Sequence, residues 1–189
     1  MKIAVAQLKS SSPYSPGKHV MAEKLNEGKE SAADWDLRTW RERAHWTEDG
    51  KALIPPMAFR NCLYDCAKFK SLRIDGKGKA TWTKHFDAGI MVFDGIVLPV
   101  TRETILYEDH FVPADGRRGG SARVMRRFPI IAKWEGVVAF YVVDETITED
   151  IFRLHLEEAG QFIGLGRWRA RNGGMNGRFE VVGLEWGEG

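Results

Sequence analysis

Cysteine is scarce in this chain, with only Cys62 and Cys66 among 189 residues. Two thiols exclude a disulfide framework and favour a reducing compartment, so we expect a cytoplasmic protein in which both cysteines are buried structural residues. No apolar run approaches the roughly 20 residues that a membrane span needs. The stretch Met1–Leu8 is too short for a signal peptide and is broken at once by Lys9. We therefore expect neither a secreted nor a membrane protein.

Neither sign of charge dominates, because 28 Lys+Arg stand against 26 Asp+Glu, for a net charge of +2. The charges are nevertheless distributed in blocks. Basic residues are concentrated in 60–84, 117–133 and 167–178, and acidic residues in 23–49 and 135–158. Three basic blocks suggest one positive face for a single-stranded RNA or DNA partner, provided that the fold brings them together. The competing interpretation is an ordinary solvated surface.

Hydrophobic periodicity predicts the elements of the first half of the chain. Residues 2–8 alternate as a buried strand does. Apolar side chains spaced i, i+3, i+4, i+7 after Pro55-Pro56 predict an amphipathic helix over 57–69. Asp94-Gly95 suits a tight turn between two strands, 86–93 and 96–100. Residues 18–50 are polar and rich in tryptophan, with weak helical signs, and we expect an irregular segment there.

The second half is predicted by the same patterns. Residues 101–123 look like a loop, and 124–132 and 137–143 look like a second strand pair joined through 134–136. Thr146 and Glu149 form a candidate capping box for a helix that Gly160 would end, and 178–184 is the closing strand.

With residues 94–133 set aside as an insertion, the order is strand, helix, strand, strand, helix, strand. That order predicts an α+β, ferredoxin-like (βαββαβ) fold: an antiparallel sheet with two helices and an inserted basic hairpin. We expect residues 1–189 to form a single domain.

The densest chemical signal is the stretch Gly164–Phe179, which holds five glycines in the fourteen residues from Gly164 to Gly177. Glycine lets backbone N–H groups approach a phosphate, and Trp168 offers a face on which a base can stack. The stretch is neither a Walker loop nor a dinucleotide fingerprint. We expect nucleic-acid contacts here; the alternative is a glycine-rich turn with solvated arginines. The candidate residues of this stretch are Arg167, Trp168, Arg169, Arg171 and Arg178.

Two further basic segments are candidates for tracking phosphates along a single strand. The proposed hairpin carries Arg117, Arg118, Arg123, Arg126 and Arg127. A lysine-rich loop carries Lys77 and Lys79. For both segments the alternative is a solvated surface.

Enzyme signals are weak. The five histidines show no metal-ligand spacing, and the two cysteines have no second ligand pair, so we expect no metal and no cofactor. A metal-free ribonuclease would need a general base, for which His19 and His85 are the candidates. Asp34 and Asp36, which flank Trp35, are candidates for supporting metal-assisted RNA cleavage. For each of these four residues the alternative is a structural or solvated side chain.

Two segments resemble the RAMP superfamily, the RNA-binding proteins that form backbone and processing subunits of CRISPR effector complexes. Ile54-Pro55-Pro56-Met57-Ala58-Phe59-Arg60-Asn61-Cys62-Leu63 resembles the start of that superfamily's first helix, with Pro56-Met57 in place of the usual glycine-serine and Asn61 in place of a glycine. Gly164–Phe179 is similar to its C-terminal glycine-rich loop.

The resemblance is greatest to backbone subunits, which stack along a guide RNA and insert a thumb hairpin between nucleotides. It implies that the hairpin around 117–127 is the thumb, and that Arg60 and the four arginines of the glycine-rich stretch line the RNA. Some backbone subunits cleave target RNA with an aspartate after the first strand, a position near Asp34 and Asp36. The chain also resembles short stand-alone proteins of phage genomes.

Three functions remain open at this point. The first is a non-enzymatic binder of single-stranded nucleic acid, RNA preferred, that assembles with copies of itself or with related subunits. The second is an endoribonuclease of the same fold. The third is a phage-encoded interaction protein that mimics or inhibits a CRISPR backbone subunit, which seven tryptophans would suit because aromatic anchors dominate interfaces.

Overall fold

The core of the protein is a four-stranded antiparallel sheet. The structure is a computed structural model, and it describes residues 1–26, 28–114, 119 and 122–189. The strands lie in the spatial order β4-β8-β1-β9, and β1 pairs with β8 on one side and with β9 on the other. Their bounds are β1 Lys2–Ser10, β4 Ile90–Met91, β8 Glu135–Val142 and β9 Phe179–Glu188.

Two helices, α2 (Pro56–Lys70) and α4 (Glu149–Glu158), cover one face of this sheet and contact each other. Side chains alternate across a strand, so β8 turns Phe140 and its neighbours at 138 and 142 inward, where all three are buried. Phe140 packs edge-on against Phe152 of α4, with ring centroids 5.2 Å apart. A short helix, α3 (Thr83–Ala88), follows α2.

The chain order β1-α2-β4-β8-α4-β9, combined with the spatial order of the strands, confirms the α+β, ferredoxin-like prediction. The predicted helix after Pro55-Pro56 is α2, and the predicted first and last strands are β1 and β9. Each of these elements has one buried face, which is why its periodicity is visible in the sequence.

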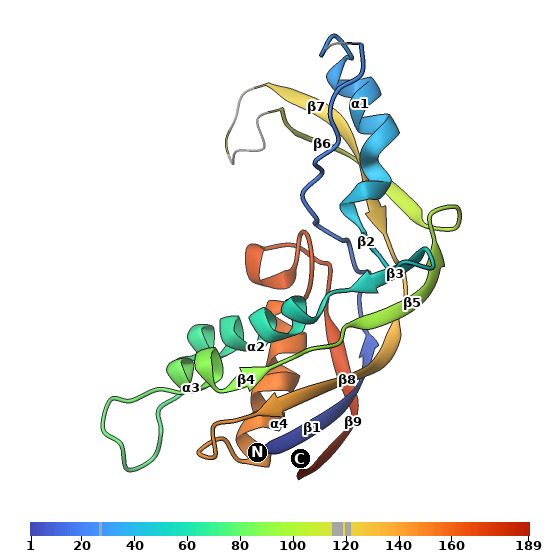
Figure 1. Cartoon of the computed structure of the whole chain (residues 1–189). Helices are drawn as coiled ribbons and strands as arrows, with labels where there is room; N and C mark the ends of the chain where they lie inside the picture. The colour runs from blue at the N-terminus through green and yellow to red at the C-terminus, as the bar shows by residue number, and fades with distance from the viewer. Residues whose placement is uncertain (27, 115–118, 120–121) are drawn as a thin grey trace.

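The remaining elements lie between those of the core. A three-stranded sheet orders β2 (His45–Trp46), β3 (Lys51–Ile54) and β5 (Ile96–Thr101). A two-stranded hairpin joins β6 (Leu106–Pro113) to β7 (Arg123–Ile130). In Figure 1 this hairpin projects away from the four-stranded sheet beside α1 (Ala32–Thr39), while both termini lie together at the opposite end.

The predicted hairpin of strands 86–93 and 96–100 is wrong. Residues 83–88 form α3, β4 is confined to Ile90–Met91, and β5 pairs with β3 instead. At Gly95 the chain passes so close to β3 that an added Cβ would lie 2.1 Å from the carbonyl oxygen of Ile54. Alternation predicts an extended segment, but it does not identify the strand with which that segment pairs.

The loop predicted over 101–123 is also wrong, because β6 occupies Leu106–Pro113. Most β6 side chains are exposed, so the strand lacks the alternation that marks a half-buried strand. The expected pairing of 124–132 with 137–143 does not form either. Strand β7 pairs with β6, whereas β8 pairs with β1 and β4.

Two predicted helix boundaries move. Thr148, not Thr146, caps α4, because its hydroxyl accepts a hydrogen bond from the Ile151 N–H. Gly160 does not end the helical segment but lies within a π-helical turn, Ala159–Ile163, where an added Cβ would lie 2.2 Å from the Phe179 carbonyl oxygen.

The segment 18–50 is not irregular throughout. It contains α1, whose start is capped by Ser31, and the 3₁₀ turn η1 (Trp40–Arg43). The hydroxyl of Ser31 accepts a hydrogen bond from the Asp34 N–H, so a local cap starts the helix in a segment with little apolar periodicity.

Candidate nucleic-acid interface

The glycine-rich stretch forms an ordered loop held against the segment that follows β1. The Arg167 N–H donates to the Ser15 carbonyl oxygen at 2.7 Å, and the Gly177 N–H donates to the Pro13 carbonyl oxygen at 2.7 Å. Gly166 has φ +75°, and a Cβ there would lie 2.3 Å from the same Ser15 oxygen. Glycine is therefore required at position 166 by both its conformation and this close approach.

A groove of about 550 Å³ lies between this loop and the start of α2. It brings together the two segments on which the resemblance to the RAMP superfamily depends, although they lie more than a hundred residues apart in the sequence. Its lining residues are Tyr14, Gly17, His45, Pro55, Met57, Ala58, Asn61, Gly166 and Arg167.

The other arginines of the loop extend from this groove along α2. Arg169 Nη2 lies 2.8 Å from Asp65 Oδ2, and the Arg171 guanidinium lies 4.8 Å from the centre of the Phe69 ring. Arg171 is exposed and forms no salt bridge within the part of the chain that the structure describes. Arg178 lies at the end of the loop, directly before β9, where its Nε donates to the Gln161 carbonyl oxygen at 3.1 Å.

Three of the predicted basic residues do not line this groove. Arg60, on α2, forms an ion pair with Asp87 at 2.8 Å. Lys77 and Lys79 are exposed in the loop between α2 and α3, which Figure 1 shows at the opposite end of the molecule from the β6–β7 hairpin. The fold therefore does not gather all the basic segments into one surface.

The arginines of the hairpin differ in how they are held. Arg127 makes a two-pronged ion pair with Asp109, with both N–O distances 2.9 Å, and this pairing lowers the pKa of the Asp109 carboxyl. Arg126 Nη2 donates to the Ala114 carbonyl oxygen at 2.7 Å, and Arg123 Nη1 donates to the Phe111 carbonyl oxygen at 3.2 Å. Arg117 and Arg118 lie outside the described residues.

Trp168 joins the loop to the hairpin. Its ring centroid lies 4.6 Å from that of Phe128 and 4.4 Å from that of His110. Its φ of +50° is in the left-handed region, which is unusual for a bulky residue. The side chain is half-buried, so it has a packing role in addition to any exposed surface it offers to a base.

The four catalytic candidates are dispersed. His85 Nδ1 lies 2.6 Å from Asp144 Oδ2, between α3 and the loop before α4. Asp34 lies in the first turn of α1, where its carboxylate accepts from the Ser31 hydroxyl, and His19 lies in the extended segment before α1. In the described ranges no hydrogen bond joins one of these four residues to another.

Asp36 is buried, and both of its oxygens are occupied. Oδ1 lies 2.6 Å from Arg43 Nη2, and Oδ2 accepts the Arg127 N–H at 2.8 Å. Sequence reasoning did not single out Arg43. Its neighbours come from α1 and from residues 127–128 and 167, so no local spacing reveals it.

Within the described ranges, no group of three or more histidines, cysteines or carboxylates is arranged to hold a metal ion. None of the helices in those ranges combines the length and apolarity required to cross a membrane. Burial raises the pKa of the Cys66 thiol to about 12 and that of Cys62 still further, so both cysteines are held as inert thiols.

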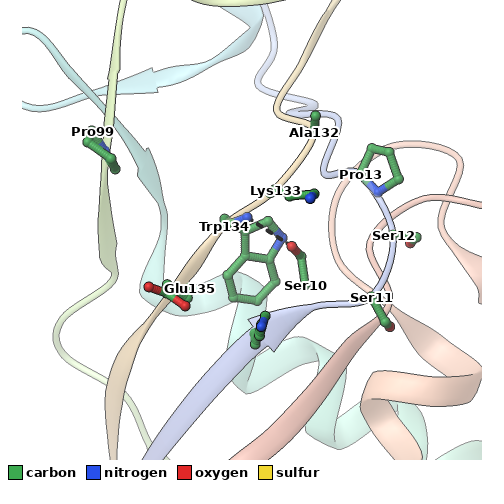
Figure 2. A pocket seen from close by; sticks show the side chains of 10 residues that line it. Ser10, Ser11, Ser12, Pro13, Pro99, Ala132, Lys133, Trp134 and Glu135 are labelled. Carbon is green, nitrogen blue, oxygen red and sulfur yellow. Dashed lines mark hydrogen bonds between the residues drawn. The ribbon is translucent and has the colours of Figure 1, made fainter.

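A separate pocket of about 500 Å³ lies where β1 ends beside the chain leading into β8 (Figure 2). Ser10 Oγ accepts the Trp134 N–H at 2.9 Å and so links the two segments. The pocket is lined by Lys9, Ser10, Ser11, Ser12, Pro13, Pro99, Ala132, Lys133, Trp134 and Glu135. None of the predicted site residues is among them.

Comparison with known proteins supports the fold alone. No family model matches the sequence, and no curated protein matches it. Among solved structures, the chain is similar to one in the cryo-EM structure of the Type III-B Cmr-beta bound to cognate target RNA, with a TM-score of 0.56 and 13% sequence identity. The match covers 98% of this chain and 60% of the other, so this chain spans about three fifths of the length of the chain it matches.

Proposed function

We propose that this protein binds single-stranded nucleic acid, RNA preferred, as a backbone-type subunit of a ribonucleoprotein and as a one-domain member of the RAMP superfamily. The observation that carries the proposal is the groove between the start of α2 and the glycine-rich loop, with Arg167 in its wall and the arginine-bearing hairpin beside it. The fold of a chain from an RNA-bound assembly supports the same interpretation.

The chemistry of the groove suits a sugar–phosphate backbone. Arginine is one of the side chains that commonly contact phosphate oxygens, and such contacts carry no sequence information directly. Arg169 and Arg171 continue the positive charge from the groove along α2. A strand lying in the groove would therefore meet guanidinium groups along its path and be bound with little dependence on its sequence.

The face of the four-stranded sheet that α2 and α4 leave open supports assembly with other subunits. Several outward-facing side chains near β4 and β8 are apolar: Phe93 is 61% exposed and Val137 is 58% exposed, and Phe93 contacts Tyr141 with ring centroids 5.0 Å apart. Glu180 and Glu185 of β9 alternate onto the same face. Contiguous exposed apolar surface marks protein interfaces, and the two acids disfavour nucleic acid on this face.

The test is the mass of the purified protein by size-exclusion chromatography with light scattering, recorded with the 260/280 nm absorbance ratio before and after nuclease. We expect a large particle with a high ratio that nuclease collapses. Val137→Glu on the open sheet face should reduce the particle mass, whereas Val97→Glu, a similarly exposed change on β5, should not. A clean small species free of nucleic acid, unable to bind added RNA, would refute the proposal.

The same open sheet face also favours a second candidate, a phage-encoded interaction protein that mimics or inhibits a CRISPR backbone subunit. Salt distinguishes the two. Nucleic-acid binding falls steeply with salt because counterions are released, whereas an aromatic and aliphatic protein interface changes little. Binding to a partner protein that is insensitive to salt, with no RNA affinity, would favour the second candidate.

A further inference from the structure

Three arginines from distant parts of the sequence converge on one small pocket. Arg43 comes from η1, Arg126 from β7 and Arg167 from the glycine-rich loop. The pocket measures about 270 Å³ and shares the lining residues Gly17 and Arg167 with the groove, so the two adjoin. Its lining residues are Gly17, Lys18, His19, Val20, Trp35, Arg43, Arg126 and Arg167.

An aromatic ring positions two of these guanidinium groups. Phe128 is 3% exposed, with the Arg43 guanidinium carbon 5.0 Å and the Arg167 guanidinium carbon 4.8 Å from its ring centre. Cation–π contacts of this kind orient a guanidinium without neutralising its charge. The third arginine, Arg126, is oriented by its hydrogen bond to the Ala114 carbonyl oxygen.

Positive charge in the pocket exceeds the negative charge that balances it. No carboxylate is among the lining residues, and among the described residues only Arg43 of the three arginines has an acidic partner, Asp36, behind it. Arg167 Nε is buried and has no hydrogen-bond partner among the described residues. Burial first, and then the charges of Arg43 and Arg126, lower the pKa of Arg167. A buried donor left unpaired among like charges is costly until an anion arrives.

We propose that this pocket binds one phosphate group and anchors a single strand at a fixed point beside the groove. The planar fork of arginine matches phosphate oxygens with two hydrogen bonds. Arg126 and Arg167 supply such donors to the pocket, whereas the Nη atoms of Arg43 already bond to Asp36 and to the Arg127 carbonyl oxygen, so Arg43 contributes mainly its charge. The identity of the phosphate as part of a nucleic-acid strand rests on the proposed function. The phosphate chemistry itself rests only on the pocket.

The first experiment measures thermal unfolding in inorganic phosphate against chloride at equal ionic strength. Phosphate should raise the Tm of the natural chain by a few degrees, because a ligand of the folded state stabilises it. Arg126→Gln should abolish that rise. Arg123→Gln is the matched control, since it removes the same charge from the same strand at an exposed position outside the pocket, and it should keep the rise.

The second experiment measures RNA affinity of the same two variants. Arg126→Gln should weaken binding by about 10- to 100-fold, the loss expected for a charge-assisted hydrogen bond, and Arg123→Gln by clearly less. Oligonucleotides with a 5′-phosphate and with a 5′-hydroxyl distinguish the source. Equal affinity indicates a phosphodiester within the strand, and a preference for the phosphorylated end indicates a terminal phosphate.

The outcomes separate this proposal from the proposed function. If the natural chain binds no RNA but Arg126→Gln still removes the phosphate-induced rise in Tm, the pocket serves a free phosphate compound and the proposed function fails. If phosphate gives no rise beyond chloride, and both variants lose equal RNA affinity, the pocket assignment is overturned while RNA binding stands.

Discussion

Asp36 and Arg43 form an ion pair, 2.6 Å from Oδ1 to Nη2, in which each side chain is only 6% exposed. The second carboxylate oxygen of Asp36 accepts the backbone N–H of Arg127, and Arg43 Nη1 donates to the Arg127 carbonyl oxygen at 3.4 Å. One pair therefore ties α1 and η1 to strand β7 of the hairpin. This arrangement gives Asp36 a structural function at the base of the projecting part of the molecule.

Removing one partner of that pair should strongly destabilise the protein. Asp36→Ala leaves the Arg43 guanidinium buried without its acid, and we expect the free energy of unfolding to fall by about 3–5 kcal/mol. Asp109→Ala is the control, because it breaks the more exposed pair with Arg127 and should cost no more than about 1 kcal/mol. Urea unfolding followed by tryptophan fluorescence measures both. An Asp36→Ala protein of normal stability that had lost an RNA-cleaving activity would instead support a catalytic role.

The Trp168→Gly variant should be more stable than the Trp168→Ala variant. Its φ of +50° costs a non-glycine residue roughly 1–2 kcal/mol, a strain that Trp168→Gly relieves and Trp168→Ala keeps. We expect the glycine variant to be about 1 kcal/mol more stable than the alanine variant in urea unfolding. Both lose the contacts to Phe128 and His110, so both should be less stable than the natural chain. A Trp168→Ala variant more stable than Trp168→Gly would contradict the inference that the backbone at position 168 is strained.

The same two Trp168 variants test base stacking. If a base stacks on the exposed part of the indole, each variant should lose about 1–3 kcal/mol of RNA-binding free energy. The losses should be equal, because neither side chain offers a ring. RNA titrations under conditions in which both variants are folded measure these losses. Unchanged RNA affinity would mean that Trp168 contributes to packing and not to base stacking.

Removing Arg169 and Arg171 together should flatten the salt dependence of RNA binding. Each phosphate contact on a single strand contributes about 0.7 to the slope of log K against log salt, so two lost contacts reduce the slope by about 1.4. The control is Arg153→Ala with Lys51→Ala, which removes the same charge from residues paired with Glu149 and Asp49 away from the loop. Equal salt slopes in the two double variants would mean that Arg169 and Arg171 do not contact the RNA phosphates.

Acidification should destabilise the protein through His155. This side chain is 1% exposed, its Nδ1–H donates to the Ile151 carbonyl oxygen at 2.8 Å, and burial lowers its pKa below the ordinary 6.5. The unfolded chain therefore takes up a proton that the folded chain resists. This contribution of His155 does not change the free energy of unfolding above about pH 6.5. It lowers that free energy as the pH drops below 6.5, by at most about 1.4 kcal/mol per pH unit.

His155→Leu isolates that contribution. The variant should show a shallower loss of stability between pH 7 and pH 5, and a residual slope is expected because burial also lowers the pKa of His45. Urea unfolding at several pH values measures the slope. A slope identical to that of the natural chain would mean that folding does not lower the pKa of His155.

Local pattern was sufficient for the elements with one buried face. The alternation of β1 and the spacing of Phe59, Cys62, Leu63 and Cys66 on α2 are visible because each of these residues contributes to one side of its element. The hairpin strand β6 was missed for the opposite reason, since most of its side chains are exposed. The predicted N-cap of α4, Thr146, lies two residues before the actual cap, Thr148, because Thr146 instead hydrogen-bonds to Asp144 in the preceding turn.

The candidate site was predicted in its parts and not in its assembly. The glycine-rich stretch was singled out from composition, but the groove needs Tyr14 and Gly17 from one segment and Met57 from another, and no spacing connects them. Arg43 was missed for the same reason, since its charge matters only beside Arg126 and Arg167.

By itself, the sequence determined the order of core elements, and with it the ferredoxin-like class, because burial of one face imposes a period on each element. The tertiary structure alone decided which strands pair, because backbone hydrogen bonds are the same for any partner strand. It also decided the state of each arginine. Arg127 and Arg169 are paired with carboxylates, whereas Arg126 and Arg167 face a pocket lined by no acid, a difference that depends on contacts between residues distant in the chain.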